Sequence, residues 1–156
     1  IMAGDFATNK PEYNVRVNVP VAKRILEAWP TPTLISGFEI GKELLFPATS
    51  IEREFGATPW NPVVEAYRAY EKMPYDRPTW DLTSVLVAVR PESKYFDLSP
   101  AGSVQVDAKG TTTFTPGKGD RRYLILQPDR RDRVLEALVL LTTQPPMAAT
   151  SASRSR

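Results

Sequence analysis

The sequence predicts an α/β domain in which helices flank a mainly parallel sheet. Residues 20–28 have the apolar spacing of a helix, and a short apolar run at residues 33–36 follows them and ends at a glycine. A helix that leads into a buried strand is typical of folds with parallel strands. The length of 156 residues fits one domain or part of one, because domains usually contain about 100–200 residues.

The composition excludes several classes of functional site. The chain has no cysteine and no histidine. Disulfides, thiolate metal sites, cysteine nucleophiles, histidine ligands and Ser-His-Asp catalysis are therefore excluded. Any bound metal must be held by oxygen ligands.

The charge balance and the hydropathy bear on the partners. Twenty basic and 18 acidic residues leave a net charge of +2, which is too small for a nucleic-acid footprint, so we expect no nucleic-acid partner. No apolar run approaches the ~18 residues of a membrane span, so we expect no membrane partner. The sequence gives no compartment.

The two ends of the chain differ in character. Residues 1–6 run from apolar residues into a glycine turn, which is typical of the end of a buried strand, so we expect the chain to enter the fold in its middle. Residues 144–156 are rich in Ala, Ser, Thr and Arg and have no apolar periodicity. They predict a disordered tail after a body that spans residues 1–143.

The first half of the body contains a short extended segment, a helix and a buried strand. Residues 14–18 alternate, which predicts a strand or an extended loop. Asn18 is placed to cap the next helix and Pro20 falls in its first turn, which predicts a helix over 20–28. Residues 33–36 then form the buried strand.

Three further helical segments follow. Residues 38–45 predict a helical turn, and residues 49–55 a short helix with a capped start at Thr49. Apolar residues at helical spacing predict helices over residues 61–71, which begin with Asn-Pro, and over residues 81–89.

The last part of the body predicts a hairpin, a strand and a helix. Residues 103–115 alternate around Lys109 and Gly110, which is a hairpin signal. Residues 123–126 form a short apolar run that predicts a strand, and residues 129–142 have the spacing of a closing helix.

Residues 9–14 combine a carboxylate with amides in a loop. In an extended segment, Glu12 and Asn14 would lie on one face. That pair would form a hydrogen-bonding surface for vicinal hydroxyl groups. The alternative is ordinary loop chemistry, in which Asn and Glu are common.

Trp80 and Asp81 form the second candidate. Asp81 stands at the start of a largely apolar helix, where it could cap the helix or interact with its dipole. It could instead be an oxygen ligand of a hard metal ion. Trp80 could belong to the core or offer a flat face to a nucleobase.

Four segments occur in a recognisable order. They are Met-Ala-Gly followed by Asn at 2–9, Pro-Glu-Tyr-Asn-Val at 11–15 before the Pro-Val-Ala helix start at 20–22, Pro-Thr-Leu-Ile-Ser-Gly-Phe-Glu at 32–39, and Thr-Trp-Asp-Leu-Thr-Ser-Val-Leu at 79–86. Together they resemble the inosine-uridine-preferring nucleoside hydrolases. The resemblance covers residues 1–95, whereas the hairpin and the last helix fit the family more loosely.

The resemblance implies a fold and an activity. The fold would be the C-terminal half of a nucleoside-hydrolase-like, Rossmann-like open sheet with a small β-hairpin near its C-terminus. The activity would be calcium-dependent hydrolysis of the N-glycosidic bond of a ribonucleoside. The sugar would bind at the carboxyl ends of the strands.

The resemblance also implies roles for individual residues. Asp81 matches a calcium ligand of the family, and Glu12 and Asn14 match the pair that hydrogen-bonds the ribose. Asn9 matches an earlier ribose-binding asparagine. Trp80 stands where many members have a histidine, and it could stack on the leaving base instead.

The sequence departs from the family in two respects. The aspartate-rich motif that supplies most calcium ligands and the general base is missing, and the chain contains no histidine. We therefore expect the isolated chain to be inactive and an uncovered sheet edge to associate with a complementing N-terminal half or with another copy. The alternative is a non-catalytic fragment, or a degenerate ribose-binding or interaction module without the metal motif.

Overall fold

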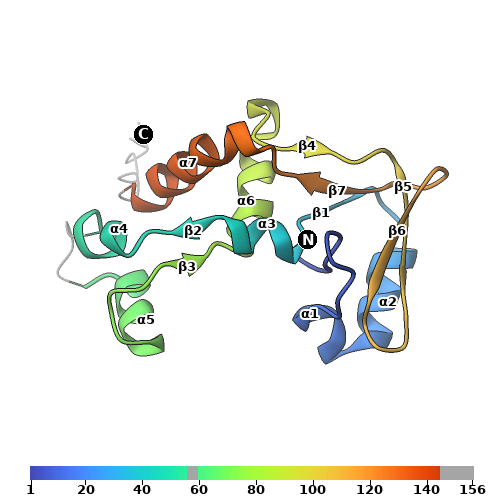
Figure 1. Cartoon of the computed structure of the whole chain (residues 1–156), viewed down its shortest axis with the longest axis horizontal. Coiled ribbons are helices and arrows are strands. Elements are labelled where there is room, and N and C mark those ends of the chain that lie inside the picture. The colour runs from blue at the N-terminus through green and yellow to red at the C-terminus, as the bar shows by residue number, and fades with distance from the viewer. Residues whose placement is uncertain (56–59, 145–156) are drawn as a thin grey trace, which may run out of the picture.

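The computed structural model describes residues 1–55 and 60–144. Its central sheet has the strand order β1-β7-β5-β6, with β4 paired to β7 (Figure 1). β1 and β7 pair in parallel, and the other pairs are antiparallel. The strands are β1 (Thr33–Ile35), β4 (Asp97–Leu98), β5 (Gly102–Val106), β6 (Thr112–Pro116) and β7 (Arg121–Ile125). The predicted α/β class is confirmed, and the sheet is mixed.

Helices cover both faces of this sheet, and each strand contributes to both layers because its successive side chains point to opposite sides. Leu34 and Leu124 pack on the side of α3, α6 and α7. Ile35 and Tyr123 pack on the side of α1 and α2. The helices are α1 (Tyr13–Val17), α2 (Val19–Ala28), α3 (Phe38–Glu43), α6 (Leu82–Val89) and α7 (Arg131–Thr143).

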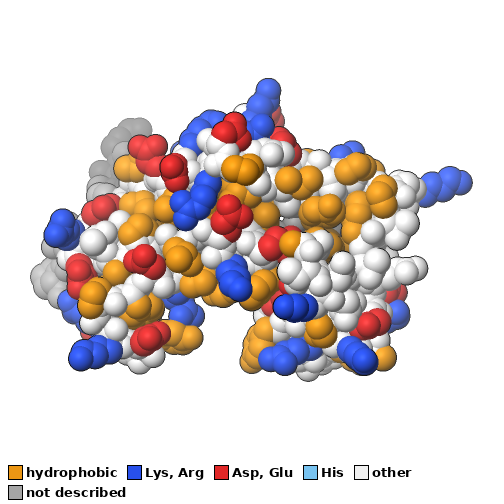
Figure 2. Space-filling view, viewed as in Figure 1, with side chains coloured by type: hydrophobic (Ala, Val, Ile, Leu, Met, Phe, Trp, Pro, Cys, Tyr) orange, Lys and Arg blue, Asp and Glu red, His pale blue; other side chains and the backbone are white. Residues whose placement is uncertain are grey.

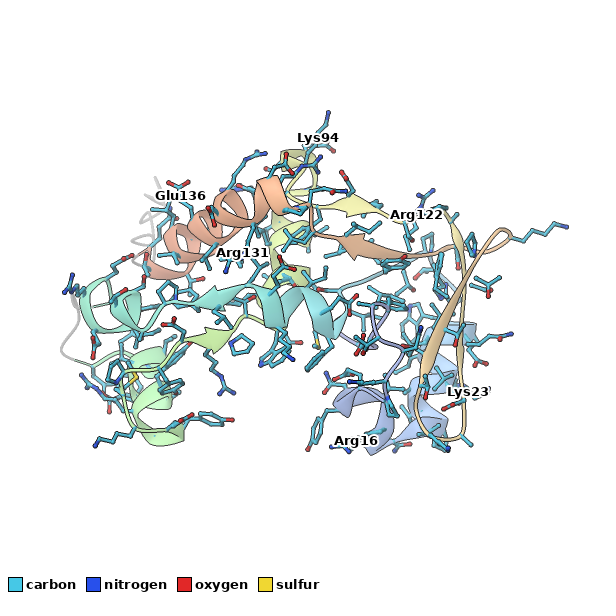
Figure 3. The ribbon with its side chains drawn as sticks, viewed as in Figure 1. Arg16, Lys23, Lys94, Arg122, Arg131 and Glu136 are labelled. Carbon is cyan, nitrogen blue, oxygen red and sulfur yellow. The ribbon has the colours of Figure 1, made fainter. Side chains whose placement is uncertain are left out.

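Polar contacts fasten two of these helices to their neighbours (Figure 3). The ammonium group of Lys23 in α2 donates a hydrogen bond to the carbonyl of Val106 at 3.1 Å, and the Val106 N–H donates to Glu27 at 2.8 Å. Arg131 in α7 donates to the carbonyl of Glu43 at 3.3 Å. The hairpin is thus tied to α2, and α7 is tied to α3.

A smaller unit extends from the main sheet at the left of Figure 1. It consists of the antiparallel pair β2 (Leu45–Phe46) and β3 (Arg77–Pro78) together with α4 (Ala48–Arg53) and α5 (Pro62–Tyr70). Phe46, Ile51 and Phe55 form its buried cluster.

Most of the predicted elements are confirmed. The helices predicted at 20–28, 61–71 and 81–89 are α2, α5 and α6. Asn18 and Asn61 accept hydrogen bonds from the N–H groups of Val21 and Val63 at 3.2 and 2.9 Å, so both act as caps.

The predicted strands and hairpin are also present. The buried strand at 33–36 is β1, in which Ile35 is completely buried. The hairpin is formed by β5 and β6. The strand predicted at 123–126 is β7, which begins two residues earlier and ends at Ile125. Met2 forms a parallel bridge with Ser36, so the first residues lie beside the end of β1.

The prediction of an extended segment at 14–18 is wrong. Residues Tyr13–Val17 form the short helix α1, and the side chain of Glu12 caps it by accepting from the N–H groups of Asn14 and Val15. Burial of Val15 holds this turn against the sheet. The two valines at alternate positions suggest a strand, but only Val15 is buried, whereas Val17 is exposed.

Two helix starts also differ from the prediction. α4 begins at Ala48, and its first N–H donates to Asp76 at 2.9 Å rather than to a cap at Thr49. The closing helix begins with a 3-10 turn at Pro128–Arg130 before α7. Apart from Gln144, which ends α7, the predicted tail at 144–156 lies outside the described residues.

Within residues 1–55 and 60–144, no helix combines the length and the apolar character needed to cross a membrane.

Candidate functional site

A pocket of about 540 Å³ lies where α1, α5 and the start of α6 approach one another. Figure 2 shows the surface hollowed at the lower edge, between the part that contains α5 and the part that contains α1. The polar side chains that line the pocket are Glu12, Asn14, Arg77 and Asp81. The other lining residues are Met2, Tyr13, Phe38, Tyr70 and Trp80.

The fold brings four of the five predicted site residues to this pocket. Glu12, Asn14, Trp80 and Asp81 all line it, although the two pairs lie far apart in the sequence. Asn9 does not line it; it is an exposed residue in a left-handed turn, with φ of 51°. Met2 and Phe38 place the pocket near the end of β1, where the sequence predicts a sugar site.

Glu12 is buried, and its carboxylate binds backbone N–H groups. It accepts from Asn14 at 3.0 Å and from Gly4 and Val15 at 3.3 Å. A carboxylate has about four lone-pair sites, so roughly one remains for a ligand. The side chain therefore fixes the start of α1 against the glycine turn, and it does not share an extended face with Asn14.

Asn14 is exposed and is oriented by Met2. Its amide nitrogen donates to the backbone carbonyl of Met2 at 3.4 Å and approaches the Met2 sulfur at 3.2 Å. The nitrogen is thus directed toward Met2, and the amide oxygen is left to accept a hydrogen bond from a ligand.

Asp81 occupies the N-cap position of α6 but does not cap it. Its side chain makes no capping hydrogen bond, and its backbone is helical, with φ of −62° and ψ of −24°. The capping interpretation is therefore wrong. The exposed carboxylate remains available to a ligand at the mouth of the pocket.

Trp80 has a strained backbone and a stacked ring. Its φ of 36° lies in the left-handed region, which costs energy for a bulky residue. The indole stacks on Phe38 with ring centroids 5.0 Å apart and an interplanar angle of 30°. This turn separates β3 from α6, and Trp80 and Asp81 both line the pocket.

Two lining residues escape prediction from the sequence. Arg77 lies three residues before Trp80, but nothing in the sequence shows that its guanidinium would lie 3.8 Å from the ring centroid of Tyr70. Tyr70 ends α5 and reaches the pocket only through the packing of the smaller unit. Phe38 does carry a signal in the sequence, because it follows the glycine that ends the predicted buried strand.

The pocket residues do not make a complete calcium site. Ca²⁺ takes about six to eight oxygen ligands. In the part of the chain that the structure describes, no three Asp, Glu, His or Cys residues are grouped so as to hold a metal ion. Asp81 supplies one carboxylate, and Glu12 is engaged by N–H groups.

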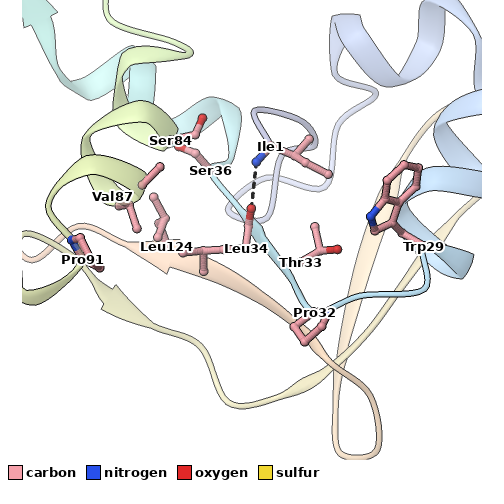
Figure 4. A pocket seen from close by; sticks show the side chains of 11 residues that line it. Ile1, Trp29, Pro32, Thr33, Leu34, Ser36, Ser84, Val87, Pro91 and Leu124 are labelled. Atoms are coloured by element: carbon pink, nitrogen blue, oxygen red, sulfur yellow. Dashed lines mark hydrogen bonds between the residues drawn. The ribbon is translucent and has the colours of Figure 1, made fainter. Parts of the chain in front are cut away.

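A second cavity, of about 460 Å³, lies between β1 and α6 (Figure 4). Its lining is mostly apolar, with Trp29, Leu34, Val87 and Leu124 among its members, and no charged side chain is among the described residues that line it. Its described lining therefore lacks the carboxylates that stabilise an oxocarbenium-like transition state.

Comparison with known proteins gives a likeness of fold. No protein-family model matches the chain, and no curated protein matches it significantly. A solved structure of an inosine-guanosine nucleoside hydrolase aligns over 92% of this chain, with a TM-score of 0.64 and 16% sequence identity. The aligned part covers 51% of that protein, so the chain spans about half its length. The chain thus has a nucleoside-hydrolase-like fold.

Proposed function

We propose that the pocket binds a ribonucleoside and forms part of the site of an N-glycosyl hydrolase. The observation that carries this proposal is that Glu12, Asn14, Trp80 and Asp81 line a single pocket. The likeness of the fold to a nucleoside hydrolase supports it. The preference for inosine or uridine that the sequence resemblance implies is part of the same proposal.

Each residue has a role that its environment allows. The amide oxygen of Asn14 and the remaining lone pair of Glu12 accept hydrogen bonds from vicinal hydroxyls of the ribose. As the N-glycosidic bond breaks, the sugar gains oxocarbenium-like positive charge, which nearby carboxylates such as Asp81 stabilise. Trp80 stacks on the leaving base.

The calcium ion that the resemblance implies requires ligands from elsewhere. We propose that Asp81 is one ligand, and that the other ligands and the general base lie outside the described residues. They would come from further chain, from a complementing polypeptide or from a second copy. Without them the pocket has neither a full oxygen shell nor a base to activate water.

A second candidate is a ribose-binding module without catalysis. Two observations favour it. The Glu12 carboxylate already accepts hydrogen bonds from three N–H groups, and the described residues contain no group of three acidic side chains that could hold a metal ion. Such a module would bind a nucleoside equally well with calcium and with a chelator.

A base-release assay separates the two candidates. We expect the 156-residue chain to bind a ribonucleoside but to release no free base, with calcium or with chelator. A preparation that also contains the complementing half should release base in a calcium-dependent way. In that preparation, Asp81→Ala should lower the rate by orders of magnitude. Asn14→Ala should cost roughly 2–4 kcal/mol of transition-state stabilisation.

The control is Asp132→Ala, which removes a carboxylate of α7 that is almost fully exposed, with a side-chain exposure of 96%. Robust turnover by the 156-residue chain alone would show that the site is misassigned. Binding without base release in the complemented preparation would favour the non-catalytic module.

A further inference from the structure

Arg77 is a cation in the pocket that the proposed mechanism does not use. Its backbone is held in β3, where it pairs with Phe46 of β2, and Phe46 belongs to the buried cluster of the smaller unit. Its guanidinium carbon lies 3.8 Å from the ring centroid of Tyr70. Arg77 therefore enters the pocket from a fixed strand rather than from a loop.

An aromatic cluster supports the ring on which Arg77 stacks. The ring of Tyr75 lies 6.3 Å from that of Tyr70 and 5.4 Å from that of Tyr67. The Tyr75 hydroxyl donates to the backbone carbonyl of Tyr67 at 2.8 Å. The guanidinium thus rests on a ring that is itself packed, and stacking leaves the in-plane N–H donors of an arginine free.

Those donors have no anionic partner in the described part of the chain. No ion pair of the described residues includes Arg77. A guanidinium has five N–H donors in a rigid fork and no acceptor, so it suits a planar group with two adjacent acceptors. Because Glu12 and Asp81 also line the pocket, a neutral heterocycle with two adjacent acceptors matches this fork better than an anion does.

Besides the planar guanidinium of Arg77, the pocket contains the stacked aromatic rings of Trp80 and Phe38. The indole can cover the face of a heterocycle while the arginine fork reads its edge. Adjacent acceptors occur at O6 and N7 of a 6-oxopurine, and arginine binds this pair in a bidentate way. Adenine presents a donor amine at the same place.

We propose that Arg77 determines base specificity, by donating to O6 and N7 of a 6-oxopurine and disfavouring adenine. This inference rests on the proposed nucleoside site, and Tyr70 acts in it as a positioning residue for Arg77. A good bidentate contact discriminates between bases by roughly 5- to 150-fold, so inosine should bind at least fivefold more tightly than adenosine.

Calorimetric titration of the 156-residue chain with inosine, adenosine and 7-deazainosine tests this proposal. The last probe keeps O6 but lacks the N7 acceptor, so it should bind more weakly than inosine. Arg77→Lys keeps the charge without the fork, and it should reduce the ratio of inosine to adenosine affinity toward one. Tyr70→Leu should reduce this ratio, whereas Tyr70→Phe, which keeps the ring, should restore it.

Arg68→Lys is the matched control, because Arg68 lies in the same region, pairs with Glu65 at 2.8 Å and does not line the pocket. It should leave the ratio unchanged. Equal affinity for inosine and adenosine, or an unchanged ratio in Arg77→Lys, would overturn the role of Arg77 while leaving the nucleoside site intact. Absence of binding by every nucleoside would overturn both proposals.

Discussion

Gly41 lies against the backbone of Trp80. A Cβ atom placed on Gly41 would approach the Cα and the N of Trp80 to 2.8 Å, which is closer than real side chains come to backbone. Gly41 belongs to α3, and Trp80 is the strained residue between β3 and α6. The left-handed turn that presents the indole to the pocket therefore depends on a missing side chain in a neighbouring helix.

Replacing Gly41 with alanine should displace Trp80. In an ordinary helix interior this change gains about 1 kcal/mol of stability. Here we expect no gain, and we expect roughly tenfold weaker nucleoside binding, because Trp80 and Asp81 move together. Calorimetric binding and urea denaturation measure the two effects. Glu43→Ala, at an exposed position of the same helix, is the control. Unchanged binding in Gly41→Ala would show that the turn tolerates the added carbon.

Substitution of Glu12 should lower the free energy of unfolding, whether or not the chain catalyses a reaction. Glu12→Ala leaves three backbone N–H groups without their acceptor, and the loss of a cap alone costs about 0.5–2 kcal/mol. We expect a total loss of at least about 2 kcal/mol in the free energy of unfolding. Asn14→Ala, at an exposed position, should change it by less than about 0.5 kcal/mol. Equal stability of the two variants would show that the Glu12 contacts do not hold the loop.

Arg121 should be among the most sensitive positions for stability. It is buried, it pairs with Asp120, and its guanidinium donates to the carbonyls of Leu26, Trp29 and Thr31 at 2.8, 2.7 and 3.2 Å. A lysine cannot reach all of these carbonyls, so Arg121→Lys should cost about 3 kcal/mol.

Urea denaturation measures this loss. Arg24→Lys, at an exposed position of α2, is the matched control and should be neutral. An effect of Arg121→Lys no larger than that of the control would mean that the end of α2 does not need the arginine.

Glu39 should make stability depend on pH. Burial raises the pKa of its carboxyl above the usual 4.5, and nearby Asp5 raises it further, against hydrogen bonds from backbone N–H groups that lower it. The folded state therefore binds more protons than the unfolded state just above pH 4.5, so this carboxyl lowers stability as pH rises through that range.

Glu39→Gln removes that titration. The melting temperature of Glu39→Gln minus that of the unsubstituted chain should increase as the pH is raised from below 4.5. This difference should become constant above the pKa of Glu39 in the folded state. Melting curves over this range measure the difference. Glu43→Gln, at an exposed position of the same helix, is the control. A difference that does not change with pH would contradict the proposed burial of charge.

The secondary structure was predictable wherever local signals agree. Asn18 with Pro20 and Asn61 with Pro62 combine a capping side chain with a first-turn proline, and both helices form as expected. The helix α1 was not predictable, because its cap comes from Glu12, whose type is unusual at that position. Its stability comes from burial of Val15 against distant strands, which no local pattern reports.

The site was predictable only in its residue types. Resemblance to a family singles out Asn9, Glu12, Asn14, Trp80 and Asp81, and the fold brings all of them except Asn9 to one pocket. The sequence does not show that the Glu12 carboxylate accepts a hydrogen bond from the N–H of Gly4, because the two residues meet only in the folded loop. The stacking of Arg77 on Tyr70 likewise depends on how α5 packs beside β3.

The most direct measurement follows the indole N–H resonances of the isotope-labelled chain by NMR during titration with inosine. The chain has three tryptophans, and substitution of Trp29 and Trp60 by phenylalanine assigns the signal of Trp80. Trp80 lines the candidate site, whereas Trp29 lines the other cavity. We expect the Trp80 signal to shift saturably, the Trp29 signal to stay in place, and Asp81→Ala to weaken the response. A Trp80 signal that does not move up to the solubility limit of inosine would contradict a nucleoside site in this pocket.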